Sequence, residues 1–237
     1  MEFEFTYKKL KIQLENIHRN NYKVVTCAEY VEHKKKGITG KLFVNRVDID
    51  ISCRQAKRIA VIFNELGIKA TFFVRLHANE YNPFSFEEYK CLKFIRDTGH
   101  ELGYHSEVID QSVIWNESAE SCLLRDIKIL NTMLDINVKG VASHGGTTGL
   151  NNLDFWKEKK AADFGLLYEA YDTQPEFNLF NESLYVSDSN YRWKNYLNGK
   201  LRQGDSRTLG ELIAANEHSV IYSTIHPDTY FNEHIYE

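Results

Sequence analysis

The sequence predicts an α/β fold in which parallel strands alternate with helices, arranged as either an open sheet or a barrel. Apolar runs of strand length alternate with segments of helical periodicity through the first two thirds of the chain. Ionisable residues stand at or just past the ends of four successive predicted strands, the edge where parallel α/β folds gather their chemistry. The length of 237 residues allows one substantial core, so we expect a single domain over 1–237.

The first part of the chain is predicted to be helical. Apolar residues recur at helical spacing from Tyr7 to Ile17. Thr26 followed by Glu29 matches a capping box that opens a second, short helix. We therefore expect residues 1–40 to form a helical extension packed on the α/β core.

The middle of the chain carries the regular alternation. The expected strands cover residues 42–49, 69–74, 101–105 and 138–142, and the expected helices cover 54–66, 85–98 and 118–134. Gly67 and Gly99 stand where a helix C-terminus favours glycine. The last third is less regular, and there we expect strands at 164–168, 183–187 and 219–225 and a helix at 207–216.

Composition excludes several classes of protein. A net charge of -4 with 26% charged residues shows no basic excess, so we expect no nucleic-acid partner. No apolar run is long enough for a signal peptide or a transmembrane segment, which predicts a cytoplasmic protein. The four cysteines are scattered without CxxC spacing, which is typical of reduced structural thiols.

Asp48 and Asp50 form the strongest candidate for chemistry. They follow an apolar run, and because side chains alternate along a strand, both point to the same face. One carboxylate can bind a metal while the other stays free as a base. The alternative is that a strand-end aspartate caps the following helix.

Three histidines at later strand ends extend this candidate site. His105 is the best metal ligand among the nine histidines, because a neutral imidazole suits Zn²⁺ or another divalent transition metal. His144 precedes two glycines and is either a ligand or a histidine packed in a loop. His226 follows an apolar run and has the titration range of a proton donor to a leaving amine. Arg75 and His77 follow another strand and are expected to shape the pocket.

These residues stand in blocks that resemble the polysaccharide deacetylases of the NodB-homology type, also called carbohydrate esterase family 4. The blocks are Arg-Val-Asp-Ile-Asp at 46–50, Gly-Ile-Lys-Ala-Thr-Phe-Phe at 67–73 and Gly-His-Glu-Leu-Gly-Tyr-His at 99–105. The resemblance covers residues 40–145 well, and residues 22–31 resemble the preamble of a cytoplasmic branch found with surface-polysaccharide biosynthesis. It implies an irregular, TIM-like (β/α) barrel that removes N-acetyl or O-acetyl groups from a sugar.

The resemblance also implies roles for individual residues. Asp48 is the expected general base, Asp50 and His105 are expected metal ligands, and His226 is the expected general acid. Most family members carry a second histidine four residues after the first, where this chain has Ile109, but the branch it most resembles has a histidine at the place of His144.

Another departure concerns the arginine that normally orients the base. Gly145 and Gly146 stand where the family commonly has Arg-Pro, so Arg46 or Arg75 is the expected substitute. Further residues complete the predicted substrate site, with apolar surface from two aromatic side chains and polar contacts from two others, namely Tyr81, Trp193, Asn82 and Asp188.

The sequence therefore predicts a deacetylase with Zn²⁺ held by Asp50, His105 and His144. Its expected substrate is an acetylated sugar, a nucleotide sugar or a lipid-linked glycan of surface-polysaccharide biosynthesis. Two alternatives stay open. The departures could mark a sugar-binding or scaffold protein without catalysis, or a metal hydrolase that acts on another amide, such as a formyl group or a cyclic ureide.

Overall fold

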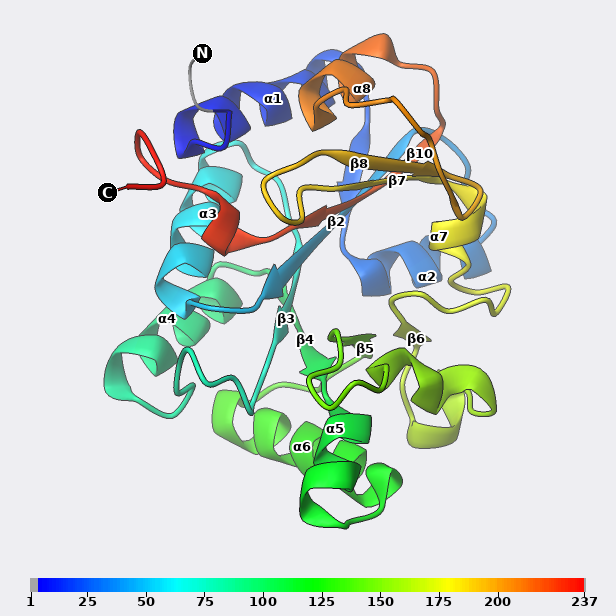
Figure 1. Ribbon diagram of the computed structural model, residues 1–237. Coiled ribbons are helices and arrows are strands. Elements are labelled where there is room, and N and C mark those ends of the chain that lie inside the picture. Colours follow the sequence, from blue (N-terminus) through cyan, green and yellow to red (C-terminus); the bar gives the residue numbers. More distant parts are fainter. Residues whose placement is uncertain (1–3, 237) are drawn as a thin grey trace.

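A curved, mostly parallel sheet with helices on its outer side forms the centre of the molecule (Figure 1). The structure is a computed structural model that describes residues 4–236. The strands are β1 (Lys23–Val25), β2 (Leu42–Ile49), β3 (Thr71–Val74), β4 (Glu101–Ser106), β5 (Gly140–Ser143), β6 (Tyr168–Glu169), β7 (Leu184–Ser187), β8 (Lys194–Leu197), β9 (Lys200–Leu201) and β10 (Val220–Ile225). Their order is β6-β5-β4-β3-β2-β10-β7-β8-β9, and β1 pairs with β2.

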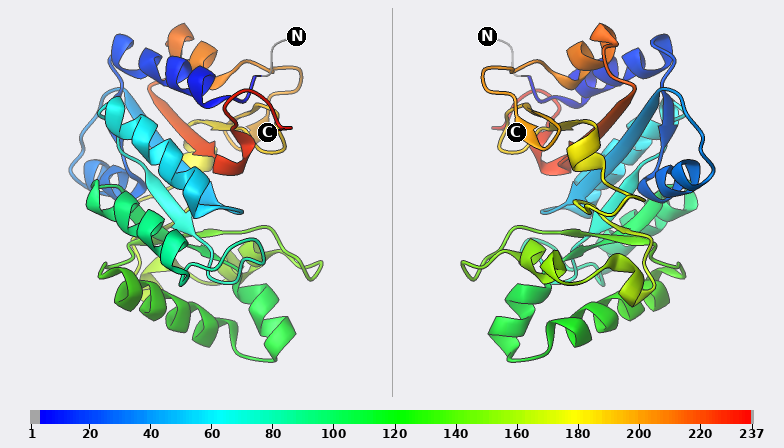
Figure 2. Two further views of the ribbon diagram at one scale, coloured as in Figure 1. Left: turned by 90° about the vertical axis from the view of Figure 1, so that its left-hand side faces the viewer. Right: turned by 90° about the vertical axis from the view of Figure 1, so that its right-hand side faces the viewer.

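Helices alternate with strands along the first part of the chain. The α-helices are α1 (Tyr7–Arg19), α2 (Cys27–Lys35), α3 (Cys53–Glu65), α4 (Phe86–Asp97), α5 (Val108–Trp115), α6 (Ala119–Leu134), α7 (Leu179–Glu182) and α8 (Leu209–Ala215), with 3₁₀ turns η1 (Asn152–Lys157), η2 (Ala161–Phe164) and η3 (Pro227–Thr229). Figure 2 shows α1, α3, α4 and α6 following one another around the outer face of the sheet. None of the helices described is long and apolar enough to cross a membrane.

Several expected boundaries are confirmed. Strand β2 covers the predicted residues, and the predicted capping box opens α2, where Thr26 and Glu29 bond to each other's backbone. The segment 1–40 contributes the strand β1 as well as α1 and α2. In the last third, the residues expected to form a strand at 164–168 run instead from η2 into the short β6.

The sheet divides the core into two layers because side chains alternate along each strand. On β2, Phe43, Val47 and Ile49 pack under the outer helices, whereas Val44 faces the inside of the curve. The inner layer is rich in aromatic rings, including Tyr168, Tyr185 and Tyr222. A strand buried on both faces is typical of a parallel sheet covered by helices, and all eight residues of β2 are buried.

The sheet is open, so the closed barrel implied by the family resemblance is not shown. Within residues 4–236, no hydrogen-bonded ladder joins β6 to β7. Side chains span this gap instead: Phe177 stacks on Tyr168 with ring centroids 4.6 Å apart and meets Tyr222 edge-on at 5.9 Å. The Tyr222 hydroxyl donates to the carbonyl of Ala170 at 3.1 Å. Aromatic side chains thus connect the two sides of the gap that hydrogen-bonded strands would connect in a closed barrel.

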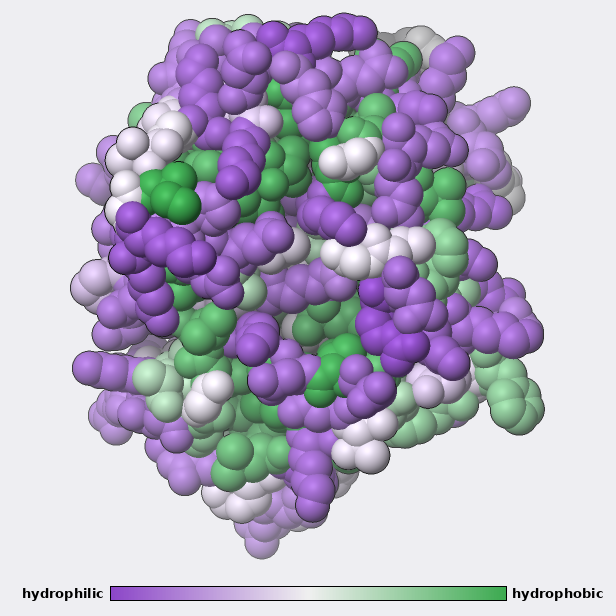
Figure 3. All heavy atoms as spheres, turned by 180° about the vertical axis from the view of Figure 1, so that it is seen from behind, coloured by the Kyte–Doolittle hydropathy of each residue, from purple (hydrophilic) through white to green (hydrophobic). Residues whose placement is uncertain are grey.

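The surface behind the view of Figure 1 is mostly hydrophilic. Figure 3 shows that hydrophobic residues on this face are divided into separate patches by polar and charged ones. The carboxyl ends of β2, β3, β4 and β5 lie at one edge of the sheet, because these strands are parallel and adjacent. Asp48, Asp50, His105 and His144 lie at or just past these strand ends.

Candidate active site

The inner face of the sheet carries the candidate site. His105 lies two residues past Gly103, and His144 lies two past Ala142, so both histidines continue the inward-facing positions of their strands. Gly103 has no room for a side chain, because an added Cβ would lie 2.5 Å from the ring of Phe73. The absence of a side chain at Gly103 allows β4 to pack closely against the ring of Phe73 on β3.

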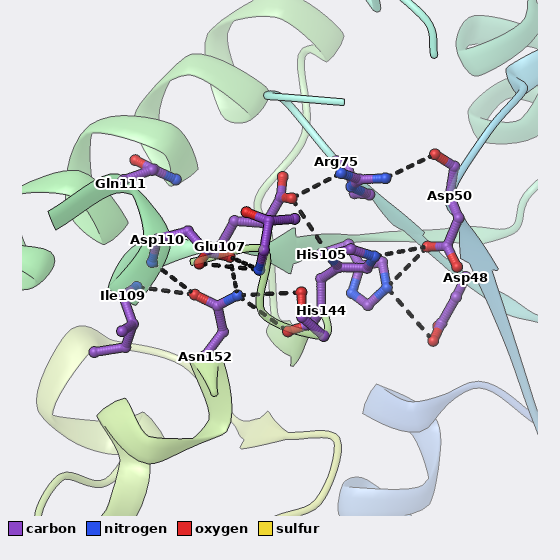
Figure 4. Close-up of polar contacts among 12 residues, drawn as sticks. Asp48, Asp50, Arg75, His105, Glu107, Ile109, Asp110, Gln111, His144 and Asn152 are labelled. Atoms are coloured by element: carbon purple, nitrogen blue, oxygen red, sulfur yellow. Dashed lines mark hydrogen bonds and ion pairs between the residues drawn. The ribbon is translucent and has the colours of Figure 1, made fainter. Parts of the chain in front are cut away.

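Asp50, His105 and His144 converge on one point. Each offers one ligand atom, and these three atoms all lie within 4.8 Å of one another. His105 Nε2 lies 3.2 Å and His144 Nε2 lies 3.9 Å from Asp50 Oδ1, and the two rings meet edge to face with centroids 5.1 Å apart. Figure 4 shows both imidazoles turned toward Asp50. The three residues predicted as metal ligands are therefore together in the fold.

The hydrogen bond at His105 Nδ1 leaves Nε2 as the atom that can bind a cation at this point. This Nδ1 lies 2.8 Å from the carbonyl of Ala142 and must carry the hydrogen to bond there, which leaves a lone pair on the neutral ring's Nε2. That lone pair faces the buried Asp50 Oδ1, which meets no hydrogen-bond donor among residues 4–236. His105 Nε2 and Asp50 Oδ1 are 3.2 Å apart, and their lone pairs repel each other unless a proton or a cation lies between the two atoms. The donor set of one carboxylate and two imidazoles suits Zn²⁺ and similar ions.

Electrostatics keep the acidic groups ionised. When a proton rather than a cation lies between the two atoms, burial disfavours the charged form of Asp50, but the hydrogen bond and charge of the protonated His105 outweigh burial and hold the pKa of Asp50 well below its usual range. Burial acts on Asp48 in the same way, and the charge of Arg46 outweighs it, so the pKa of Asp48 is also lowered.

Arg46 holds Asp48 in a two-pronged ion pair. Its Nε donates to Asp48 Oδ1 and its Nη2 to Asp48 Oδ2, both at 2.8 Å. The side chain of Arg46 is only 1% exposed, and its guanidinium lies 4.7 Å from the ring centroid of Tyr171. In this position Arg46 orients the carboxylate and has no face free for a sugar.

His226 and Asp188 form a second pair close to Asp48. The Asp188 carboxylate lies 2.6 Å from His226 Nδ1 and also accepts from the His226 backbone N–H. His226 Nε2 lies 4.0 Å from Asp48 Oδ2. Burial favours the neutral ring, but the hydrogen bond and charge of Asp188 outweigh it and raise the pKa of His226 to about 9. The Nε2 of His226 therefore carries a proton near Asp48.

Glu107 is a site residue that the sequence analysis missed. Its Oε1 accepts from Arg75 Nη2 at 2.8 Å and lies 3.3 Å from His144 Nδ1, which links the arginine to the third histidine. Arg75 also donates to the backbone carbonyl of Asp50 at 3.0 Å. Alternation along β4 could have revealed it, since Glu107 is two residues past His105.

Asp110 and Asn152 were also missed, and they fix the loop that carries His144. Asn152 Nδ2 donates to the His144 carbonyl at 3.1 Å and to Asp110 Oδ2 at 2.8 Å. The Asp110 carboxylate accepts from the backbone N–H of Thr147 and Thr148. These residues are far apart in the sequence, so no local pattern indicates their contact.

Ile109 lies outside the cluster. In Figure 4 it is on the far side of Asn152 from His105 and His144. Its side chain packs against the outer apolar core, and its backbone N–H bonds to Asn152 Oδ1 at 2.9 Å. This position would not deliver a side chain to the Asp50 carboxylate in the present backbone.

The remaining predicted substrate residues are spread around the site. The Tyr81 hydroxyl lies 3.0 Å from both the Ile49 and the Arg75 carbonyl, at the ends of β2 and β3, and can donate to either; the side chain is buried. His77 Nε2 lies 2.9 Å from the buried Asp126. Asn82 is exposed and Trp193 packs against Phe5, with ring centroids 5.6 Å apart. Their substrate-binding roles stay predictions.

Comparisons with known proteins add little. The chain matches no protein-family model and none of the curated proteins. One similar solved structure is the Streptococcus pyogenes deacetylase PplD in complex with acetate, at 15% identity and a TM-score of 0.43. The match covers 56% of this chain and 59% of that chain, so the chain spans about three fifths of PplD. At these values the likeness supports no statement about chemistry.

Proposed function

We propose that this protein is a metal-dependent hydrolase that removes an acetyl group, N-linked or O-linked, from a sugar. The observation that carries the proposal is the meeting of Asp50, His105 and His144 within 4.8 Å. Asp48 Oδ2 lies beside this cluster, 3.6 Å from His105 Nε2. A base and a metal site side by side are the elements of metal-assisted acyl hydrolysis.

Asp50, His105 and His144 would hold the cation, and three protein ligands leave open coordination positions for reactants. When bound, Zn²⁺ or a similar ion supplies Lewis acidity to the acetyl carbonyl and to water. Arg75 and Glu107 keep the ligands in place, since Arg75 bonds the Asp50 backbone and Glu107 lies against His144.

Asp48 acts as the general base in this proposal. Arg46 fixes both of its oxygens, so the carboxylate stays ionised and correctly turned. Asp48 takes a proton from water as the water oxygen bonds to the acetyl carbon.

His226 acts as the general acid for an N-acetyl substrate. Asp188 occupies Nδ1, which directs the available proton of His226 to Nε2. This proton passes to the sugar nitrogen as the carbon–nitrogen bond breaks, giving acetate and a free amine. We propose that the substrate belongs to surface-polysaccharide biosynthesis, as an acetylated sugar, a nucleotide sugar or a lipid-linked glycan.

Acetate release from N-acetylated sugars by the zinc-loaded protein tests the proposal. The Asp48→Asn variant removes the base but keeps the shape of the site, so we expect it to bind zinc normally and to lose activity by about 10²- to 10⁴-fold. Asp154→Asn, an exposed change on η1, is the matched control and should leave activity unchanged. Full activity in Asp48→Asn would contradict the assignment of the base. Metal binding without acetate release from any sugar would favour a sugar-binding protein, and release of another acid would indicate a different amide.

A further inference from the structure

A pocket of about 250 Å³ lies next to His226 and has no part in the chemistry proposed above. Four aromatic side chains line it, with the centroids of contacting rings 5.2–6.2 Å apart. They are Tyr171, Phe180, Tyr185 and Tyr196. The ring of Tyr171 also lies on the guanidinium of Arg46, which binds the proposed base, so the pocket adjoins the reacting groups.

The sheet register extends the inner face of the site into this pocket. Arg46 lies opposite Thr224, Thr224 opposite Ser187, and Ser187 opposite Lys194. Residues paired in this way share one face of a sheet. Lys194 on β8 therefore faces inward like Arg46, and it lines the pocket. Two strand spacings separate β8 from β10, whose last residue, Ile225, precedes His226, so the two backbones are about 10 Å apart.

Lys194 brings a positive charge without a matching carboxylate. Its Nζ donates to Ser189 Oγ at 3.3 Å, and the lysine is half-buried. Among residues 4–236, no carboxylate comes within 4.0 Å of this ammonium group, and the nearby Asp188 is bonded to His226. A partly desolvated cation is stabilised by an anion. A ligand in this pocket can supply one.

We propose that this pocket is a substrate subsite for a sugar ring that carries an anionic group, a carboxylate or a phosphate, which Lys194 binds. The inference rests on the proposed deacetylase function and narrows its substrate to acidic N-acetyl sugars. The aromatic rings offer apolar surface to the C–H faces of a sugar, and Ser187 and Ser189 offer hydroxyl groups. The separation from His226 suits an anionic group placed across one ring from the acetylated nitrogen.

Binding measurements separate this inference from catalysis. Isothermal titration calorimetry would compare neutral N-acetylglucosamine, N-acetylglucosamine 1-phosphate and N-acetylglucosaminuronic acid on the full chain carrying Asp48→Asn, so that turnover does not consume the probes. We expect one or both anionic sugars to bind at least about 10-fold more tightly than the neutral one, since a charged hydrogen bond is gained. The tighter of the two identifies the anionic group as carboxylate or phosphate.

Variants at Lys194 show whether its charge causes the preference. Lys194→Met should remove the preference for the anionic sugars, Lys194→Arg should keep it, and Lys200→Met on the exposed β9 is the matched control that should change nothing. Equal binding of neutral and anionic sugars, or an anionic preference that survives Lys194→Met, would overturn the subsite. Anionic preference with no acetate released from any sugar would instead leave the subsite standing and contradict the deacetylase function.

Discussion

The arginine beside the base illustrates what a single residue position determines. Arg46 and Arg75 are the two expected substitutes for the arginine that orients the base in the family that the sequence resembles. Arg46 contacts both oxygens of Asp48, whereas Arg75 contacts Glu107 and the Asp50 backbone. The reason is the strand period: Arg46 is two residues before Asp48 on β2 and so faces the same side.

The buried His100 should make the stability of the fold depend on pH. It lies at the start of β4, where its Nδ1 accepts from the backbone N–H of Ala70 and its ring packs against Phe72. Burial and the nearby charge of Lys69 lower the pKa of His100 from 6.5 to about 4. Between these values the unfolded chain binds more protons, so stability is lost as pH falls from 6.5 toward 4, by up to about 3 kcal/mol.

Urea unfolding at about pH 8 and about pH 5 measures this effect. His100→Gln should remove this part of the pH dependence, although it lowers stability at both values. His18→Gln, at an exposed histidine on α1, is the control and should keep the wild-type dependence. The same pH dependence in His100→Gln as in the wild type would show that the buried imidazole is not its source.

At the scale of elements, the loop after β5 decides whether His144 can be a ligand. Asn152, at the start of η1, bonds the His144 carbonyl, and Asp110 bonds Asn152. Asn152→Ala removes this attachment, so we expect zinc affinity to fall by about 10- to 100-fold, as for other residues that orient metal ligands. Competition with a colorimetric chelator measures the affinity.

The neighbouring Asn151→Ala is the matched control. Asn151 is exposed and caps η1 through the backbone N–H of Leu153, without contact to His144 in the hydrogen bonds described. It should lower stability slightly and keep zinc affinity. If both variants bound zinc like the wild type, the loop would not need Asn152 to place the ligand.

The sequence predicts the elements around the site better than those beyond it. Strand β2 and helices α3, α4 and α6 agree with prediction within one or two residues, because their apolar periodicity, capping residues and glycines are all local signals. Strands β8 and β9 were not predicted. Both strands are short. Only one residue of β8 is buried and none of β9, so their formation depends on pairing, of β8 with β7 and of β9 with β8, more than on their own residues.

At the scale of the whole molecule, parallel order brings the site together. Asp50, His105 and His144 lie at or just past the ends of three strands that are far apart in the sequence. In the sheet, β2 and β4 both border β3, and β5 borders β4. The alternation of strands and helices predicts that these strand ends share one edge, and the family resemblance adds His144 as the third ligand. The openness of the sheet was not predictable in the same way, because it depends on how Phe177 packs between Tyr168 and Tyr222.

Metal should stabilise the whole fold, because its proposed ligands come from three segments that separate on unfolding. Zinc at 100 to 1,000 times its Kd should add about 3–4 kcal/mol to the free energy of unfolding. For a chain of this size that raises Tm by roughly 10 °C. Differential scanning calorimetry with zinc and after chelation measures the change, and His105→Ala should abolish it. An unchanged Tm in the wild type would argue against a site shared by these strands.

The proposed metal site needs His144 as its third ligand, beside Asp50 and His105. Equilibrium dialysis followed by elemental analysis tests it most directly, applied to the wild type and to His144→Ala. We expect about one zinc per wild-type chain and at least about 100-fold weaker binding in the variant. A wild type without bound metal, or a variant that binds zinc as tightly as the wild type, would contradict it.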